Sequence, residues 1–161
     1  MKGTTPLTYL MRKILLKRNQ CKLQTEIRPL KDIRTATVLI DSSEPGYESV
    51  VGKVKSFFSS YNIDANVLAP QLKDMAWPGM IRRKVRYPGN RSRLDGLFIN
   101  MNPTHNFTSE YEARCSMALF KVGREQLDGD IYDLVVSNPK DGVPTQDEVF
   151  SAIQDLLTKI R

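Results

Sequence analysis

Hydrophobic residues occur in short, nearly unbroken runs from position 35 onward, and polar, turn-forming residues separate these runs. Runs rich in β-branched and apolar residues are typical of strands that are buried on both faces. The predicted strands cover residues 35–41, 63–68, 94–100, 119–123 and 132–137. Between them, apolar residues recur at helical spacing. This spacing predicts helices over 47–61, over about 108–118 with Ser109 as a cap, and from Thr145 onward.

Alternation of strands and helices predicts a mostly parallel sheet with helices on both faces. We therefore expect an α/β three-layer sandwich, Rossmann-like or flavodoxin-like, formed by residues 35–161 as a single domain. Residues 1–34 are expected to form a basic N-terminal helix and a linker. Two alternatives stay open for residues 81–87, which fit either an edge strand or an ordered basic loop.

The N-terminal helix is predicted over residues 6–24, with Thr5 as its cap and Pro6 at its first position. The apolar residues on one face of this helix are Leu7, Leu10, Met11, Ile14 and Leu15. Three partners suit such a stripe: the body of the protein, which we favour, a second copy in a homo-oligomer, or an anionic membrane surface.

Length and composition limit the class of protein. With 161 residues and 26% charged residues, the chain suits one soluble domain. No apolar run reaches the roughly 18–20 residues of a membrane span, and Arg12 and Lys13 interrupt the N-terminal apolar run, which argues against a secretory signal. Cys21 and Cys115 have no Cys or His at ligand spacing, so neither a disulfide framework nor a metal site is predicted. We expect a cytoplasmic protein, either free or peripheral to a membrane.

Charge is segregated along the sequence. Residues 2–34 hold nine Lys or Arg against two acids, and residues 77–93 hold six basic residues and no acid. The rest of the chain is net acidic, although the whole carries a formal charge of +6. Two basic segments on an acidic body predict contact with an anionic partner, either nucleic acid or a membrane surface.

The second basic segment supplies the candidate anion-binding residues Arg82, Arg83, Lys84, Arg86, Arg91 and Arg93. Trp77 and Tyr87 lie among them and suit stacking on nucleic-acid bases. Two structural explanations compete with this one. Basic residues protect an edge strand from aggregation, or they pair with the acidic half of the chain.

Polar residues follow the predicted strands where each strand ends. Ligands bind at this carboxyl edge in open α/β sheets. The candidate rim residues are Asp41, Ser42, Asn100, Asn102, His105, Ser137 and Asn138. Asn, Ser and Asp are also ordinary loop residues, so a purely structural role is the alternative. The glycine patterns that cradle phosphates are missing from the sequence, and no catalytic residue, cofactor or metal is predicted.

With the strands placed, the chain resembles a small family of bacterial α/β proteins, found mainly in Bacteroidetes and described as a domain of unknown function. The resemblance rests on the basic N-terminal helix, Trp77, the acid-rich closing helix and three strand motifs, TVLID at 37–41, LDGLFIN at 94–100 and ALFKVG at 118–123. It implies the fold and brings no activity with it.

A second, local resemblance is to the N-terminal half of heptosyltransferase-type glycosyltransferases. It consists of a strand, a polar loop and a helix followed by Ala118, Lys121, Val122 and Gly123. That family binds its sugar nucleotide mostly through a second Rossmann half, for which 161 residues leave no room. This resemblance therefore supports the fold more than sugar transfer.

Two functional hypotheses follow. The first is a non-catalytic cytoplasmic protein that binds an anionic or protein partner through its basic segments. We favour it because the charge partition is present while a catalytic constellation is not. The second is a small enzyme or ligand-binding module whose site lies at the rim of strand ends.

Overall fold

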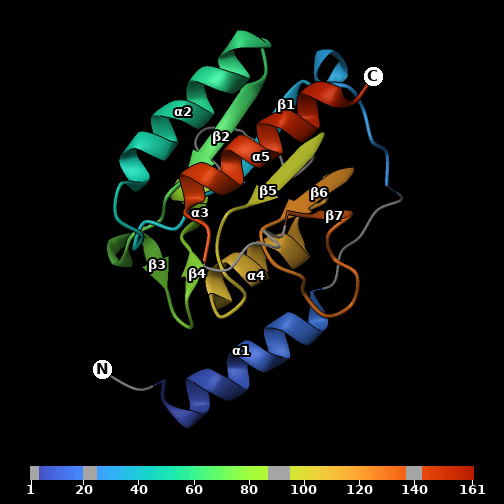
Figure 1. Cartoon of the computed structure of the whole chain (residues 1–161). Helices are drawn as coiled ribbons and strands as arrows, with labels where there is room; N and C mark the ends of the chain where they lie inside the picture. Colours follow the sequence, from blue (N-terminus) through green and yellow to red (C-terminus); the bar gives the residue numbers. More distant parts are fainter. Residues whose placement is uncertain (1–3, 20–24, 87–94, 137–142) are drawn as a thin grey trace.

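The computed structural model describes residues 4–19, 25–86, 95–136 and 143–161. Its main sheet consists of β1 (Thr35–Leu39), β2 (Asp64–Leu68), β5 (Leu97–Asn100), β6 (Phe120–Gly123) and β7 (Leu134–Val135). Neighbouring strands are parallel throughout, in the order β2-β1-β5-β6-β7. This is the order 2-1-3-4-5 of flavodoxin-like folds. The predicted parallel α/β sandwich is thus confirmed (Figure 1).

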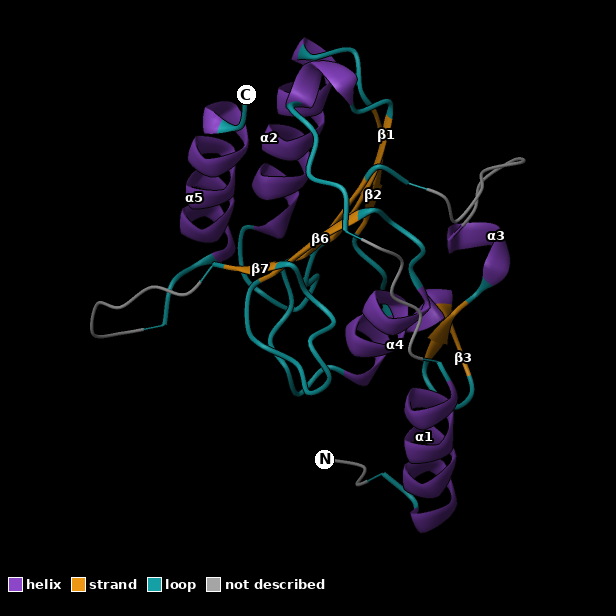
Figure 2. Ribbon diagram, turned by 90° about the vertical axis from the view of Figure 1, so that its right-hand side faces the viewer, coloured by secondary structure: helices purple, strands orange, loops and turns teal. Residues whose placement is uncertain are grey.

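Helices cover both faces of the sheet (Figures 1 and 2). On one face, α2 (Tyr47–Ser60) and α5 (Gln146–Lys159) pack side by side. The other face carries α4 (Phe107–Cys115), the antiparallel hairpin of β3 (Met75–Ala76) and β4 (Met80–Ile81), and the short α3 (Arg83–Arg86). Two 3-10 turns, η1 (Leu30–Asp32) and η2 (Leu72–Asp74), precede β1 and β3.

Alternate side chains of the central strands contribute to two apolar cores. Ala36 and Val38 of β1 share one core with Phe150 of α5. Leu39 belongs to the core on the opposite face, with Ala113 of α4. All residues of β5 are buried, because this strand lies between β1 and β6 with helices above and below. That position explains why Leu97, Phe98 and Ile99 follow one another without a polar residue.

The N-terminal helix α1 (Pro6–Arg18) lies outside the sandwich, beside α4 and the β3–β4 hairpin (Figure 2). Trp77 Nε1 donates to Thr8 Oγ1 at 3.2 Å, and Arg12 Nε donates to the Pro78 carbonyl at 2.7 Å. The Arg12 guanidinium also lies over the Phe107 ring, 4.8 Å from its centroid. No residue of α1 is buried. The expected docking of this helix on the body is thus confirmed, and Thr8 and Arg12 supply its polar contacts. The apolar stripe contributes only in part, since Met11 and Leu15 are half-buried while Leu7, Leu10 and Ile14 are exposed.

Two predicted boundaries need correction. The N-terminal helix ends at Arg18 and not at residue 24, because Asn19 has non-helical backbone angles (φ −109°, ψ 89°). For residues 81–86 neither alternative, edge strand or basic loop, describes the structure, since β4 ends at Ile81 and α3 covers Arg83–Arg86, while residue 87 lies outside the described residues. Among the described residues, no helix combines the length and apolar character needed to cross a bilayer.

Candidate functional site

The order of strands in the sheet reverses direction between β1 and β5: β2 lies on the outer side of β1, and β6 and β7 lie on the outer side of β5. The chain leaves β1 toward α2 on one face and leaves β5 toward α4 on the other. Ligands bind at such switch points in open α/β sheets. A pocket of about 210 Å³ lies here. It is lined by Leu39–Ser43, Pro70–Leu72, Met75, Asn102, Asn106, Thr108 and Ser109.

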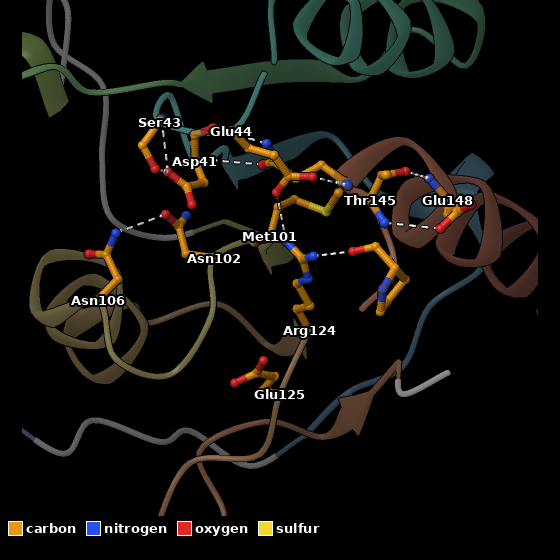
Figure 3. Close-up of polar contacts among 12 residues, drawn as sticks. Asp41, Ser43, Glu44, Met101, Asn102, Asn106, Arg124, Glu125, Thr145 and Glu148 are labelled. Atoms are coloured by element: carbon orange, nitrogen blue, oxygen red, sulfur yellow. Dashed lines mark hydrogen bonds and ion pairs between the residues drawn. The ribbon is translucent and has the colours of Figure 1, made fainter. Parts of the chain in front are cut away.

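Asp41, which follows β1, stands in this pocket (Figure 3). Its Oδ1 accepts hydrogen bonds from the Ser43 backbone N–H and hydroxyl, at 2.9 and 2.6 Å. The buried Gln146 side chain fixes the backbone of Asp41, accepting from its N–H at 2.8 Å and donating to its carbonyl at 2.9 Å. The carboxylate is therefore oriented through one oxygen, while Oδ2 has no partner among the described residues.

Asn100 has a structural role at the end of β5. Its side chain is buried, with Nδ2 donating to the Tyr132 hydroxyl at 2.7 Å and Oδ1 accepting from the Asn102 backbone at 2.9 Å. Burial raises the pKa of Tyr132 above its usual value, so the phenol stays neutral. Asn100 thus ties strand ends together, and it does not line the pocket.

Asn102 lies deeper in the pocket wall and is only 6% exposed. Its Oδ1 accepts a hydrogen bond from Asn106 Nδ2 at 3.0 Å. Its own Nδ2 meets no acceptor among the described residues, and in Figure 3 this amide points toward Asp41. The predicted rim residues Asp41, Ser42 and Asn102 are therefore brought together in one pocket.

The N-terminus of α4 forms the opposite wall of the pocket. Asn106 is its cap, accepting the Ser109 N–H through Oδ1 at 3.1 Å. The prediction of Ser109 as the cap is wrong, because Ser109 already lies inside the first turn. Thr108, also on this wall, donates its hydroxyl proton to the Gly79 carbonyl at 2.6 Å.

The remaining rim predictions do not reach the pocket. His105 is exposed in the loop before α4 and is not part of the lining. Ser137 and Asn138 lie outside the described residues. Across the part of the chain that the structure describes, no group of three or more His, Cys, Asp or Glu is placed to hold a metal ion.

Arg124, at the end of β6, links four elements beneath this edge of the sheet (Figure 3). Its guanidinium pairs with Glu44 at 3.1 Å and donates to the carbonyls of Met101 and Pro144. Glu44 also accepts the Gln146 N–H at 2.8 Å, at the start of α5. The Arg124 side chain is 6% exposed, so it acts as a buried cross-link and is not available to a ligand.

The second basic segment is divided by the fold. Arg83 and Lys84 are exposed on α3, and Arg82 is exposed while donating to the Met75 carbonyl at 3.1 Å. Arg86 is instead buried and paired with Glu112 of α4, so its prediction as an anion-binding residue is wrong. Arg91 and Arg93 lie outside the described residues.

The outward face of α1 combines exposed apolar and basic side chains. Leu7, Leu10 and Ile14 are 64%, 55% and 37% exposed. Lys13 and Lys17 are exposed beside this stripe. Trp77, which contacts α1 through Thr8, is 57% exposed. We refer to Leu7, Leu10, Ile14, Lys13 and Lys17 as the outer face of α1.

Comparison with known proteins gives no further guide. No protein-family model matches the chain, and no significant match was found among the curated proteins or the solved structures. The two resemblances inferred from the sequence therefore stay predictions.

Sequence reasoning missed several residues that line the pocket. Gln71 follows the carboxyl end of β2, and the rule that identified Asp41 and Asn102 applies equally to it. The sequence did not identify Asn106 as the cap of α4, because Ser109 is also a good capping residue. The Arg124–Glu44 pair had no local signal, since its partners lie 80 positions apart.

Proposed function

We propose that this is a non-catalytic, membrane-peripheral protein that binds an anionic membrane surface through the outer face of α1. The observation that carries the proposal is the exposure of Leu7, Leu10 and Ile14 on a helix that is docked by its other side. A helix with apolar side chains on one face and Lys or Arg beside them binds in the interface between headgroups and acyl chains.

Several neighbouring features support the same partner. Trp77 is exposed next to α1, and tryptophan is favoured at the membrane–water interface. Residues 4–19 contain four basic residues and no acid. An anionic leaflet attracts each nearby Lys or Arg with about 1 kcal/mol. A location on the cytoplasmic side, where the leaflet is anionic, is therefore part of the proposal.

Other partners fit the outer face of α1 less well. A second copy of the helix would bring Lys13 and Lys17 near like charges with no acid on α1 to offset them. Nucleic acid would use the lysines and leave the apolar stripe without a role. In Figures 1 and 2, α3 with Arg83 and Lys84 lies at the far end of the β3–β4 hairpin from α1. The two basic segments are therefore treated as separate surfaces.

Vesicle co-sedimentation tests this proposal. The protein is mixed with vesicles of phosphatidylcholine alone or with added phosphatidylserine, at low and at physiological salt. We expect retention on the anionic vesicles, weakening with salt. The variant Lys13→Gln/Lys17→Gln should bind these vesicles roughly 30-fold more weakly, which corresponds to the loss of about 2 kcal/mol of attraction.

The apolar contribution needs its own variant and control. Leu7→Ser/Leu10→Ser/Ile14→Ser should abolish retention while leaving the melting transition intact, because none of these side chains is buried. The control Leu72→Ser/Val143→Ser removes apolar side chains that are 94% and 87% exposed elsewhere, and it should bind like the parent. Equal retention of the triple variant, or a dimer that it converts to a monomer, would overturn the proposal.

A further inference from the structure

The pocket between β1 and β5 has an unusual balance of polar groups. Its lining contains the hydroxyls of Ser42, Ser43, Thr108 and Ser109 and the amides of Gln71, Asn102 and Asn106. Among the described lining residues, Asp41 is the single charged side chain, and none is Lys or Arg. A carboxylate without a neighbouring cation disfavours phosphate and other anions.

Two polar atoms in this pocket are available to a ligand. Asp41 Oδ2 is an acceptor whose companion oxygen is held by Ser43. Asn102 Nδ2 is a donor on a side chain that is 6% exposed, and its companion oxygen is held by Asn106. The two side chains point toward each other, and no hydrogen bond joins these two described groups (Figure 3). Asn102 Nδ2 thus faces the pocket with its hydrogen atoms free for a ligand acceptor, and Asp41 Oδ2 can accept a ligand hydroxyl.

The segment that follows β2 contributes apolar side chains to the pocket wall. Pro70, Leu72 and Met75 line it, and Leu72 is 94% exposed at its margin. The volume of about 210 Å³ is below the roughly 300–1,000 Å³ typical of pockets for drug-sized ligands. The ligand is therefore small, with one hydrogen-bonding edge and one apolar face.

We propose that this pocket binds a neutral polyol of sugar or nucleoside size, with two adjacent hydroxyls bridging Asp41 and Asn102. One hydroxyl donates to Asp41 Oδ2, and the next accepts from Asn102 Nδ2. A carboxylate at the end of a strand accepts ribose hydroxyls in this way in other α/β sheets. The C–H face of the sugar ring packs against Leu72 and Met75. This site is independent of the outer face of α1.

The test is ligand-observed NMR with D-ribose and adenosine as probes, and with ribose 5-phosphate as the anionic comparison. We expect both neutral probes to bind, and ribose 5-phosphate to bind no more tightly than ribose. Asp41→Asn keeps the oxygen that Ser43 contacts and replaces Oδ2 with a donor. Asn102→Asp keeps the oxygen that Asn106 contacts and replaces Nδ2 with an acceptor. Each should weaken adenosine binding at least tenfold.

Asp155→Asn provides the matched control, because it makes the same exchange on an exposed residue of α5. It should bind adenosine like the parent protein. Thermal melting of each variant verifies that the fold is retained. If neither neutral probe binds, if ribose 5-phosphate binds more tightly, or if folded Asp41→Asn and Asn102→Asp bind like the parent, the proposal is wrong.

Discussion

Arg86 and Glu112 form an ion pair in which each side chain is only 8% exposed. Arg86 lies at the end of α3 and Glu112 within α4, so the pair joins the hairpin region to the helix that covers the sheet. The Arg86 guanidinium also lies 5.7 Å from the centroid of the Tyr111 ring. The backbone carbonyl of Arg86 accepts a hydrogen bond from Asn66 Nδ2 at 2.9 Å. Arg86, although it belongs to the second basic segment, therefore stabilises the fold and does not add to the basic surface.

Removing one partner of this pair should destabilise the protein strongly. Arg86→Ala or Glu112→Ala leaves the other charge buried, at a cost of about 3–5 kcal/mol in the free energy of unfolding. The double replacement Arg86→Met/Glu112→Leu should cost less than either single change, because no charge is left buried. Urea denaturation measures all three. Arg83→Gln, on the exposed side of α3, is the control and should change stability by less than about 0.5 kcal/mol.

Two glycines should respond to alanine in opposite directions. A Cβ added at Gly123 of β6 would overlap the Tyr132 ring, so Gly123→Ala should cost about 1–3 kcal/mol. Gly52 lies on the exposed side of α2 with open space around it, so Gly52→Ala should stabilise the protein by about 0.5–1 kcal/mol. Thermal melting distinguishes the two, and a neutral Gly123→Ala would contradict the packing described for β6 and Tyr132.

The role of Asn106 as the cap of α4 can be distinguished by mutation from its hydrogen bond to Asn102. Asn106→Ala removes the oxygen that accepts the Ser109 N–H and should cost about 1 kcal/mol. Asn106→Ser keeps a capping oxygen and loses the donor to Asn102, so most of the stability should remain. The comparison is made by denaturant titration. Equal losses in both variants would mean that the contact with Asn102 matters more than the cap.

Glu125 should contribute a pH-dependent part of the stability. The backbone N–H of Thr104, at 2.9 Å, holds the pKa of this carboxyl below its usual value. A carboxyl with a lowered folded-state pKa stabilises the fold above the unfolded value of about 4.3, and this contribution is lost as the pH falls through the folded value. The gap in denaturation midpoint between the parent and Glu125→Gln should therefore shrink from about pH 7 to about pH 3. A gap that is the same at both values would contradict this role.

Much of the fold could be predicted because its signals are local. The β-branched residues of 35–41 and the helical spacing of 47–61 predict a strand and a helix without knowledge of the rest of the chain. Thr145 with Glu148 forms the capping box at the start of α5 that this sequence pattern favours. The order of strands could not be predicted in the same way, since it depends on pairings between residues that are distant in the sequence.

The candidate site could be predicted only in part, for a related reason. The carboxyl-edge rule indicated Asp41 and Asn102, which line the pocket, but it did not distinguish them from Asn100, whose side-chain amide donates to the Tyr132 hydroxyl. Charge was a poor guide to exposure as well. Arg86 and Arg124 are basic yet buried, because each meets an acid that lies far away in the sequence.

Because α1 contributes no buried residue, its separation from the sandwich disrupts neither apolar core. Amide hydrogen exchange should therefore divide the chain into two cooperative units. The amides of α1 need only the loss of the Thr8 and Arg12 contacts and the exposure of a few half-buried side chains before they exchange with solvent, whereas those of β5 exchange only on global unfolding. The N-terminal helix can thus change its contacts with the rest of the protein while the sheet stays folded.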